Sequence, residues 1–273
     1  MMTFESTSAS RRARVSTKIE DVDPWAEIYG APGLEGPVAA DATISGPLAS
    51  PDVTLSARND GGPIRVPGTS VMADEAALDV SLTDGRLDIR RATVSTGIGR
   101  GRVAGWIDLL VSRPSPEAIR EGDFAVRRTQ PAELDFSVEQ VDAAGVGGLT
   151  DLGMDVAGRV DASGSLRGTL QSPRGRLEAS LTDGSIAGQP IPSAHIDGGV
   201  EADGFYVDSL RVDAAGAGQL RAQGRLGYDE TYNALVEGDD IRLDQIVPVS
   251  DLAGSLAPRG RADFELHGRG SLD

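Results

Sequence analysis

Apolar and polar residues alternate along most of this chain, and residues typical of turns interrupt the alternation at short intervals. Leu78, Val80 and Leu82 are separated by polar residues. The turn-forming run Thr83-Asp84-Gly85 follows, and the alternation resumes at Leu87. A period of two places every second side chain on the same face of a β-strand, so this order predicts a β-hairpin with one apolar and one polar face.

The same order of strand, turn and strand returns in the second half of the chain. Alternation from Leu177 to Leu181 leads into Thr182-Asp183-Gly184, which repeats the earlier Leu-Thr-Asp-Gly sequence and predicts a second hairpin turn. A third turn is predicted at Ala202-Asp203-Gly204, between two further alternating stretches. Gly216-Ala217-Gly218 is interpreted as another connection between strands. Frequent turns between alternating stretches are typical of an antiparallel meander.

A longer phrase also recurs. Gly46-Pro47-Leu48-Ala49-Ser50-Pro51 returns 122 residues later as Gly168-Thr169-Leu170-Gln171-Ser172-Pro173, and a third copy begins at Gly270-Ser271-Leu272. A glycine precedes each copy by ten residues, at Gly36, Gly158 and Gly260. The predicted structural positions of this motif are Gly46, Leu48, Pro51, Gly168, Leu170 and Pro173. Repetition at a fixed long period indicates tandem structural units. The fold and the function are therefore expected to depend on several units together.

The resulting expectation is an all-β chain, an elongated antiparallel groove (a β-taco) built from repeats of about 120 residues. Short helical caps are expected at 24–29, 144–151 and 245–251. The expected segments are a disordered or partial N-terminal segment at 1–18, a first repeat at 19–140 with a loop insertion at 112–130, a second repeat at 141–240, and the start of a truncated third repeat at 241–273.

Composition makes a large closed core an unfavourable interpretation. Hydrophobic residues make up 39% of the chain and aromatic residues only 4%, although aromatic side chains normally supply much of a buried core. The formal charge of −16 argues against nucleic-acid binding, which needs clustered Lys and Arg. No apolar run approaches the length of a membrane helix, and no signal-peptide apolar region follows the N-terminal arginines.

Candidate chemistry is sparse. The chain has two histidines, His195 and His267, no cysteine, and no serine in a nucleophile-elbow context. Gly97-Ile98-Gly99-Arg100-Gly101 lacks the third glycine, the helix and the acidic residue of a dinucleotide site. Asp239 and Asp240 with Asp244, like Asp21 with Asp23, do not follow a calcium-loop pattern and are interpreted as solvated turns. The expectation is therefore a protein that is not an enzyme, with no catalytic residue, metal or cofactor.

The apolar face is the remaining candidate site. Its predicted lining consists of Val53, Leu55, Leu78, Val80, Leu82, Leu87, Ile89, Val94, Leu177, Leu181, Ile196, Val200, Leu210, Val212 and Leu220, and the same alternation adds Val103, Tyr206 and Leu226. One interpretation is the core of an ordinary sandwich. The other is a long trough that shields lipid acyl chains from water, which repetition favours because an array lengthens a groove.

The phrase from Gly46 to Pro51, with Leu34-x-Gly36 and a short apolar cap before it, resembles the AsmA-like superfamily of bacterial envelope proteins. Within that superfamily it is similar to the translocation and assembly module (TamB) family. The second copy, from Gly158 to Leu181, is the closest match, and its run from Leu170 to Leu177 is similar to that family's recurring Gly-x-Leu-x-x-Pro phrase. The resemblance covers most of the chain apart from the first 18 residues and the insertion.

The resemblance implies a segment of a bridge-like lipid carrier in the periplasm. It implies phospholipid acyl chains as the ligand, transport between the inner and outer membranes, and support of outer-membrane protein assembly through a barrel partner. Because the family's membrane helix and barrel-binding region are lacking, a middle segment of an inner-membrane-anchored protein is expected, with no partner contact assignable to residues here. The alternative is a structural or adhesive secreted β-solenoid with a closed core.

Overall fold

The structure is a computed structural model. It describes residues 2–7, 10–20, 35–47, 51–65, 71–109, 130–145, 156–169, 171–186, 188–242 and 260–271, with side chains from residue 12 onward. The helical caps predicted at 24–29 and 245–251, the insertion at 112–130, and the motif residues Leu48 and Leu170 lie wholly or almost wholly outside these ranges. Of the cap predicted at 144–151, Ala144 and Gly145 are described, and both are helical.

Nearly all the described residues belong to β-strands. The chain forms two compact units, one comprising Met1–Phe136 with Arg167–Gln171 and the other Ser137–Leu166 with Ser172–Asp273. The strands are β1 (Met2–Thr7), β2 (Ser10–Ile19), β3 (Val38–Ser45), β4 (Asp52–Asn59), β5 (Ile64–Arg65), β6 (Met72–Thr83), β7 (Arg86–Thr96), β8 (Gly99–Asp108), β9 (Pro131–Asp142), β10 (Val156–Thr169), β11 (Ser172–Ile186), β12 (Gln189–Glu201), β13 (Gly204–Ala214), β14 (Gly218–Gly227), β15 (Thr231–Arg242) and β16 (Arg261–Ser271).

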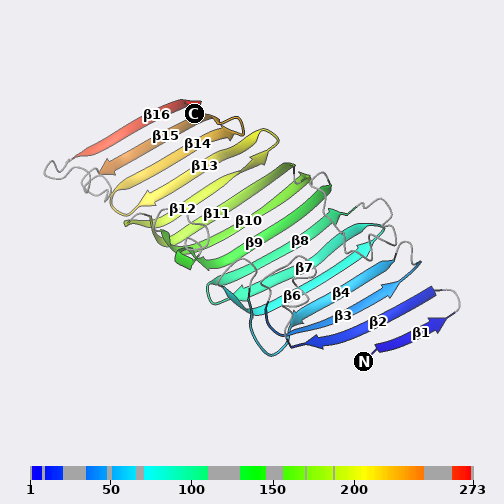
Figure 1. Cartoon of the computed structure of the whole chain (residues 1–273). Helices are drawn as coiled ribbons and strands as arrows, with labels where there is room; N and C mark the ends of the chain where they lie inside the picture. Colours follow the sequence, from blue (N-terminus) through cyan, green and yellow to red (C-terminus); the bar gives the residue numbers. More distant parts are fainter. Residues whose placement is uncertain are drawn as a thin grey trace. The chain divides into compact units, whose positions relative to one another are not determined.

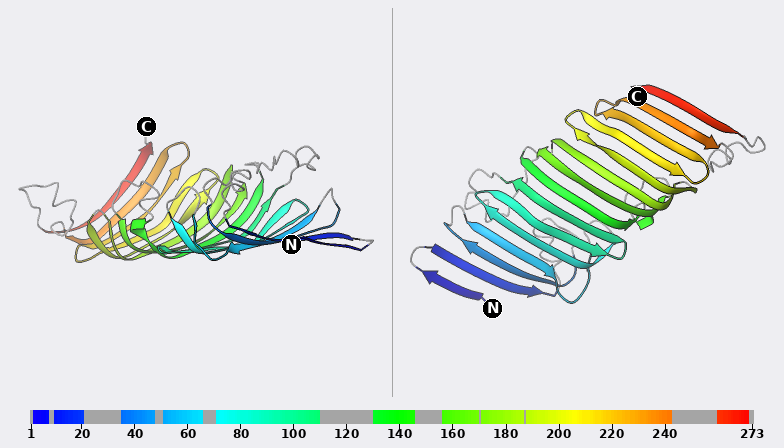
Figure 2. Two further views of the ribbon diagram at one scale, coloured as in Figure 1. Left: turned by 60° about the horizontal axis from the view of Figure 1, so that its bottom comes forward. Right: turned by 180° about the vertical axis from the view of Figure 1, so that it is seen from behind.

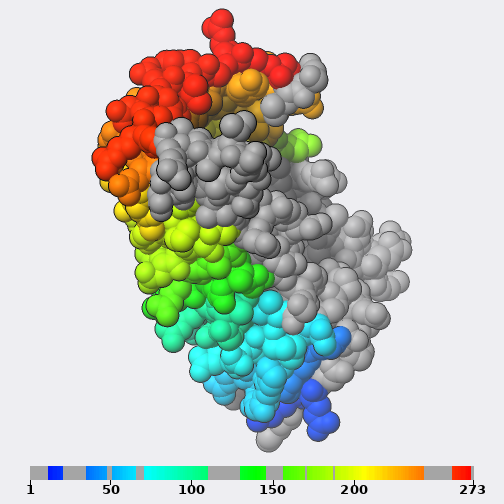
Figure 3. All heavy atoms as spheres, turned by 90° about the vertical axis from the view of Figure 1, so that its left-hand side faces the viewer, coloured from blue at the N-terminus to red at the C-terminus, as the bar shows by residue number. Residues whose placement is uncertain are grey.

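Each unit is an open antiparallel meander. In the first unit the strands lie in the order β1-β2-β3-β4-β6-β7-β8, and the short β5 pairs with β6. In the second unit β10 to β16 also follow chain order (Figure 1). The colours of the second unit therefore succeed one another in bands from green to red (Figure 3). The predicted all-β antiparallel class is confirmed.

The first predicted hairpin turn is correct. Thr83 pairs with Arg86, which leaves a two-residue loop of Asp84 and Gly85 with φ values of 51° and 79°. Two successive residues with positive φ characterise the type I′ turn, whose twist matches that of the flanking strands. The turns predicted at Ala202-Asp203-Gly204 and Gly216-Ala217-Gly218 are also present, at 202–203 and 215–217, while Gly204 and Gly218 begin the strands that follow.

The second predicted turn, Thr182-Asp183-Gly184, is wrong. These residues lie inside β11, where Thr182 pairs with Ser193 and Gly184 with Ile191, and the chain reverses only after Ile186. Asp183 nevertheless has a φ of 50°, close to that of Asp84. The local sequence therefore set the left-handed residue in both places, whereas strand pairing determined whether the chain reversed.

The N-terminal residues also differ from the expectation for 1–18. Residues 2–7 and 10–19 form β1 and β2, and β2 pairs with β3 from Arg12 opposite Ser45 to Ile19 opposite Val38. This segment is part of the first unit's sheet instead of a disordered region. The boundaries predicted at 140 and 240 remain predictions.

The recurring glycines share an unusual backbone conformation. Gly36, Gly158 and Gly260 have φ values of 125°, 118° and 137°. Gly46 and Gly168 have φ values of 86° and 106°. Since such φ values strain residues that carry a Cβ, glycine is required at these positions.

A carboxylate contact recurs in two of the copies as well. Asp161, three residues after Gly158, accepts a hydrogen bond from the backbone N–H of Gln140 at 2.9 Å. Asp263, three residues after Gly260, accepts one from the N–H of Asp240 at 2.8 Å. Gln140 and Asp240 both have positive φ, at 52° and 51°. Corresponding residues of two copies thus stabilise the same backbone irregularity.

Candidate functional site: the apolar sheet face

Residues that lie directly opposite each other on neighbouring strands share a face of the sheet, so the register shows which side chains lie together. In the first unit Val53 is opposite Leu82, Leu55 is opposite Val80, and Val80 is opposite Ile89. The register places all the predicted lining residues of this unit on one face: Val53, Leu55, Leu78, Val80, Leu82, Leu87, Ile89, Val94 and Val103. A bulge at Arg90 keeps Ile89 and Val94 on the same face despite their odd spacing.

The second unit has an equivalent face. Leu181 is opposite Ala194, Ala194 is opposite Val212, and Val212 is opposite Leu220. The predicted residues that share this face are Leu177, Leu181, Ile196, Val200, Leu210, Val212, Leu220 and Leu226. The register therefore places all the predicted residues except Tyr206 on the apolar face of their own unit.

Tyr206 is the exception, and its predicted place with this set is wrong. It pairs with Gly199 and Arg225 on the polar face. The register of β13 shifts between Val207 and Leu210, so the alternation changes phase there. Phe205 and Val207 consequently join the apolar face, which the sequence pattern did not reveal.

The polar face is held together by cross-strand charged contacts. Arg91 donates to Asp79 at 2.6 Å, and Arg225 bridges to Glu201 at 3.1 Å. Hydrogen bonds from Ser56 and Arg91 lower the pKa of Asp79 below the usual value for aspartate. A hydrogen bond with Tyr206 raises the pKa of Arg176.

The aromatic residues of this polar face are covered by guanidinium groups. Arg86 lies 4.0 Å from the ring centre of Trp106, and Arg225 lies 5.8 Å from that of Tyr206. These are cation–π distances. Both aromatic rings are therefore accommodated on a hydrated surface without a hydrophobic core.

The apolar face has little protein cover among the described residues. Contacts between the described strands of each unit join sheet neighbours, so these strands form a single layer. No large side chain of the described residues is fully buried. Five apolar-face residues are among the exposed large hydrophobic residues: Ile44 at 41%, Leu177 at 37%, Phe205 at 52%, Leu226 at 37% and Leu266 at 59%.

A small buried cluster lies at one end of the second unit's strands. Ala143, Leu181 and Ile191 are buried there, with Val160 and Val212 packed against them. The burial is local and does not extend along the face. The strands of this unit are visibly curved along their length in Figure 2.

Side-chain size varies systematically across the second unit's apolar face. Along β12 to β16 a central row contains mostly small residues, namely Gly198, Val207, Gly224, Ala234 and Gly268, whereas β11 contributes the larger Leu177 to the same row. One neighbouring row contains Ile196, Leu210, Ala222, Val236 and Leu266. The row on the other side contains Val200, Phe205, Leu226 and Tyr232. A strip of small side chains therefore crosses β12 to β16, between two rows of bulkier apolar side chains.

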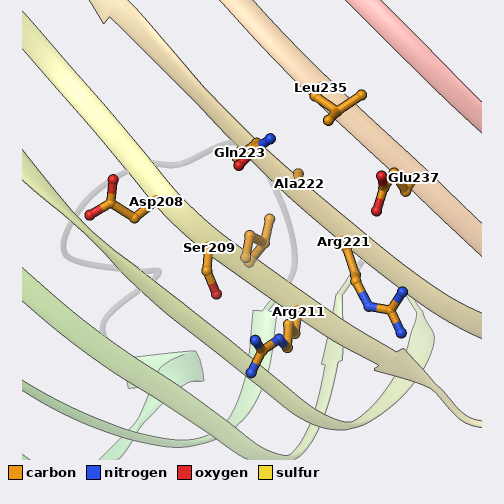
Figure 4. A pocket seen from close by; sticks show the side chains of 9 residues that line it. Asp208, Ser209, Arg211, Arg221, Ala222, Gln223, Leu235 and Glu237 are labelled. Carbon is orange, nitrogen blue, oxygen red and sulfur yellow. The ribbon is translucent and has the colours of Figure 1, made fainter.

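The opposite face carries a shallow cavity of about 160 Å³ at the β13 bulge (Figure 4). Its charged and polar lining includes Asp208, Ser209, Arg211, Arg221 and Glu237. The lining contains a serine but no histidine that could activate it. This cavity accordingly has hydrogen-bonding capacity without a nucleophile–base pair.

The remaining ionisable candidates have local partners. His195 lies 3.7 Å from Glu178, and His267 contacts Glu265. Asp240 pairs with Arg261 at 2.9 Å. Within the described ranges no group of three acidic, histidine or cysteine side chains could hold a metal ion. Asp21, Asp23 and Asp244 lie outside those ranges.

The described residues thus form open antiparallel sheets with one hydrated face and one apolar face, and no second layer of described strands covers the apolar face. None of the helical residues that the structure describes forms a segment long and apolar enough to cross a membrane. Comparison of the chain with family models, curated proteins and solved structures gave no match.

Proposed function

We propose that the apolar face binds phospholipid acyl chains, as a segment of a bridge-like carrier that moves phospholipid between the inner and outer membranes. The observation that carries this proposal is the continuous apolar face of each unit, which no second layer of the described residues covers. Exposed apolar surface of this extent marks an interaction site in soluble proteins. A ligand with aliphatic chains would cover the exposed apolar side chains of such a face.

The energetics favour a flexible hydrocarbon chain as this ligand. Removing one methylene group from water contributes about 0.8 kcal/mol. Along β12 to β16, the row of small residues through Gly198 and Gly224 lies between rows of bulkier side chains, where an acyl chain would fit. It contains no polar side chain that would fix one headgroup, so the binding is expected to be unselective among lipids.

The larger assembly belongs to the same proposal. Tandem repeats of about 120 residues would lengthen the apolar face into a groove. The shared φ values of Gly36, Gly158 and Gly260 support equivalent units. Periplasmic location, an inner-membrane anchor in the full-length protein, support of outer-membrane protein assembly and an outer-membrane barrel partner follow from the resemblance to the AsmA-like superfamily alone.

No observation favours the β-solenoid alternative. A solenoid of short coils stacks parallel strands around a closed interior. From β11 to β16, each strand instead pairs antiparallel with the next strand along the chain. Phe205 and Leu266, which lie on the face that a closed core would bury, are exposed.

Two adjacent residues of β15 provide a matched test. Val236 lies on the apolar face opposite Ala222, whereas Leu235 lies on the polar face opposite Gln223. Both are aliphatic and half-buried. The full chain and its Val236→Asp and Leu235→Asp variants would be expressed in a Gram-negative host, and bound lipid would be measured by native mass spectrometry and extraction.

We expect phospholipid on the unmodified chain, a several-fold loss in Val236→Asp and near-normal binding in Leu235→Asp. Circular dichroism checks that both variants keep their β structure. A lipid-free wild-type chain, or equal losses in two folded variants, contradicts the proposal.

A further inference from the structure

Two arginines face each other on the polar face of the second unit. Arg211 of β13 lies directly opposite Arg221 of β14, and Figure 4 shows the two side chains on these neighbouring strands. Directly opposed residues of an antiparallel pair have Cα atoms ~4.5–5.5 Å apart, and like charges in such positions destabilise the pairing. The chain has 42 acidic and only 26 basic residues, so two adjacent arginines run against its overall charge.

The charge of this arginine pair is not neutralised by an ion pair. None of the ion pairs formed by the described residues includes Arg211 or Arg221. Glu237 of β15 lies directly opposite Arg221, yet the two side chains form no ion pair. On the same face, by contrast, Arg225 bridges to Glu201 at 3.1 Å. The arginine pair therefore has donor capacity that the described residues leave unused.

The arginine pair lines a cleft that offers further hydrogen-bond donors. The cleft has a volume of about 570 Å³, within the range of about 300–1,000 Å³ that is typical of small-molecule sites. His195 of β12 lies directly opposite Arg211, so three basic residues follow one another across β12, β13 and β14. The other polar lining residues are Ser180, Thr182, Ser193, Asp213 and Gln219. Asp213 is the one carboxylate among the described lining residues, so the cleft has a positive balance of charge.

The smaller cavity of about 160 Å³ shares both arginines with this cleft. It adds the hydroxyl group of Ser209 as a further donor, together with the carboxylates of Asp208 and Glu237. These two carboxylates place the more acidic surroundings on the side of the smaller cavity. An anionic ligand is therefore expected to enter from the side of the 570 Å³ cleft.

We propose that Arg211 and Arg221 form a binding site for a phosphate group with two negative charges, either a phosphate monoester or free phosphate. A guanidinium group donates two parallel hydrogen bonds to phosphate oxygens, and two guanidinium groups match the charge of a dianion. Both arginines are exposed, so the site is accessible from solvent. The bound dianion also offsets the repulsion between the two guanidinium groups.

This inference stands independently of acyl-chain binding, because the two sites lie on opposite faces of the sheet. Arg211 alternates along β13 with Leu210 and Val212, which belong to the apolar face. The arginine pair is also expected to discriminate between phosphate groups. A phosphate diester carries one negative charge and leaves one guanidinium group unneutralised, so it should bind more weakly than a monoester.

Titration calorimetry of the full chain tests the ligand class at low salt and slightly alkaline pH, where phosphate monoesters carry two charges. We expect glycerol 3-phosphate or inorganic phosphate to bind on the order of tenfold more tightly than the diester glycerophosphocholine, since a second charge-assisted contact is made. Tighter binding of glycerol 3-phosphate than of inorganic phosphate identifies an ester as the ligand, and the reverse order identifies free phosphate. The proposal is overturned if neither compound binds.

Variants of the arginines test the location of the site. Arg211→Gln and Arg221→Gln should each weaken binding of the tighter ligand by roughly tenfold, because each removes one charged donor. Arg225→Gln is the matched control: it lies on β14 on the same face and loses the same charge, but its guanidinium group is engaged by Glu201. Its binding should stay close to that of the unmodified chain.

Thermal unfolding separates a ligand site from a structural role of the arginines. Without phosphate, Arg221→Gln should melt at the same or a higher temperature than the unmodified chain, because a like-charge contact is removed. With phosphate, the unmodified chain should gain more than the variant. Equal losses of binding in folded Arg221→Gln and Arg225→Gln would show diffuse attraction and overturn the site. A chain that binds phosphate but no lipid refutes only the acyl-chain proposal.

Discussion

Asp79 illustrates how single residues hold the polar face together. It lies opposite Ser56 of β4 and Arg91 of β7, so its carboxylate joins three consecutive strands. Arg91 donates through Nε at 3.0 Å and through Nη2 at 2.6 Å to the same carboxylate oxygen. The hydrogen bond from Ser56 is the largest cause of the lowered pKa of Asp79, and Arg91 is the next.

This arrangement predicts a pH-dependent contribution to stability. Because the pKa of Asp79 is lower in the folded chain than in the unfolded chain, the contribution is present above the usual aspartate pKa and is lost as the pH falls through the lowered value. Ser56→Ala should raise the pKa of Asp79 toward its usual value. Carboxyl-carbon NMR titration measures it, with Thr54→Ala on the same face as the control. An unchanged Asp79 titration in Ser56→Ala contradicts the assignment.

At the scale of elements, an identical tetrapeptide has two structural roles. Leu82 to Gly85 ends β6 in a type I′ turn, whereas Leu181 to Gly184 continues within β11. The difference arises from the neighbouring strand, since β12 pairs with β11 on both sides of Asp183. The residues of this tetrapeptide therefore permit a chain reversal in both places, and the pairing of the flanking strands determines where the chain reverses.

The type I′ turn makes a specific prediction about the β6–β7 hairpin. Gly85 has a φ of 79°, so Gly85→Ala forces a side chain into the left-handed region and should destabilise the fold by about 1 kcal/mol. Asp84→Asn should be nearly neutral, because asparagine tolerates that region. Urea denaturation compares the two variants. A loss in Asp84→Asn as large as that in Gly85→Ala would argue against this turn type.

At the scale of the whole molecule, the described strands of each unit form a single layer, and no second layer of described strands covers its apolar face. The described residues include few buried hydrophobic side chains, of which Leu181, Ile191 and Ile241 are the largest together with Ile64. A ligand that covers the face is therefore expected to stabilise the folded chain more than the unfolded chain.

This expectation separates acyl-chain binding from headgroup binding. A short-chain phosphatidylcholine below its micellar concentration should raise the melting temperature, and a concentration of 100 times Kd adds about 2.7 kcal/mol. Glycerophosphocholine, which has the same headgroup without acyl chains, should leave the melting temperature unchanged. Equal stabilisation by both compounds would place recognition at the headgroup and contradict the proposed site.

The sequence by itself determined the features that depend on neighbouring residues. The alternation around Leu78 and Leu181 defined strands with one apolar face, and Asp84-Gly85 defined a tight turn, because side-chain direction and φ preferences are local properties. The lining residues on regular strands were accordingly placed on the correct face. The recurring spacing of Gly36, Gly158 and Gly260 was also visible in the sequence, whereas their positive φ values are a finding of the structure.

Only the tertiary structure decided the features that depend on strand pairing. The bulge after Val207 moved Tyr206 to the polar face and Phe205 to the apolar face, and pairing with β12 kept residues 182–184 inside β11. Pairing with β3 made β2 a strand of the sheet. Alternation gives the same signal for a sandwich and for an open sheet, because it reports which face is apolar and not what covers that face.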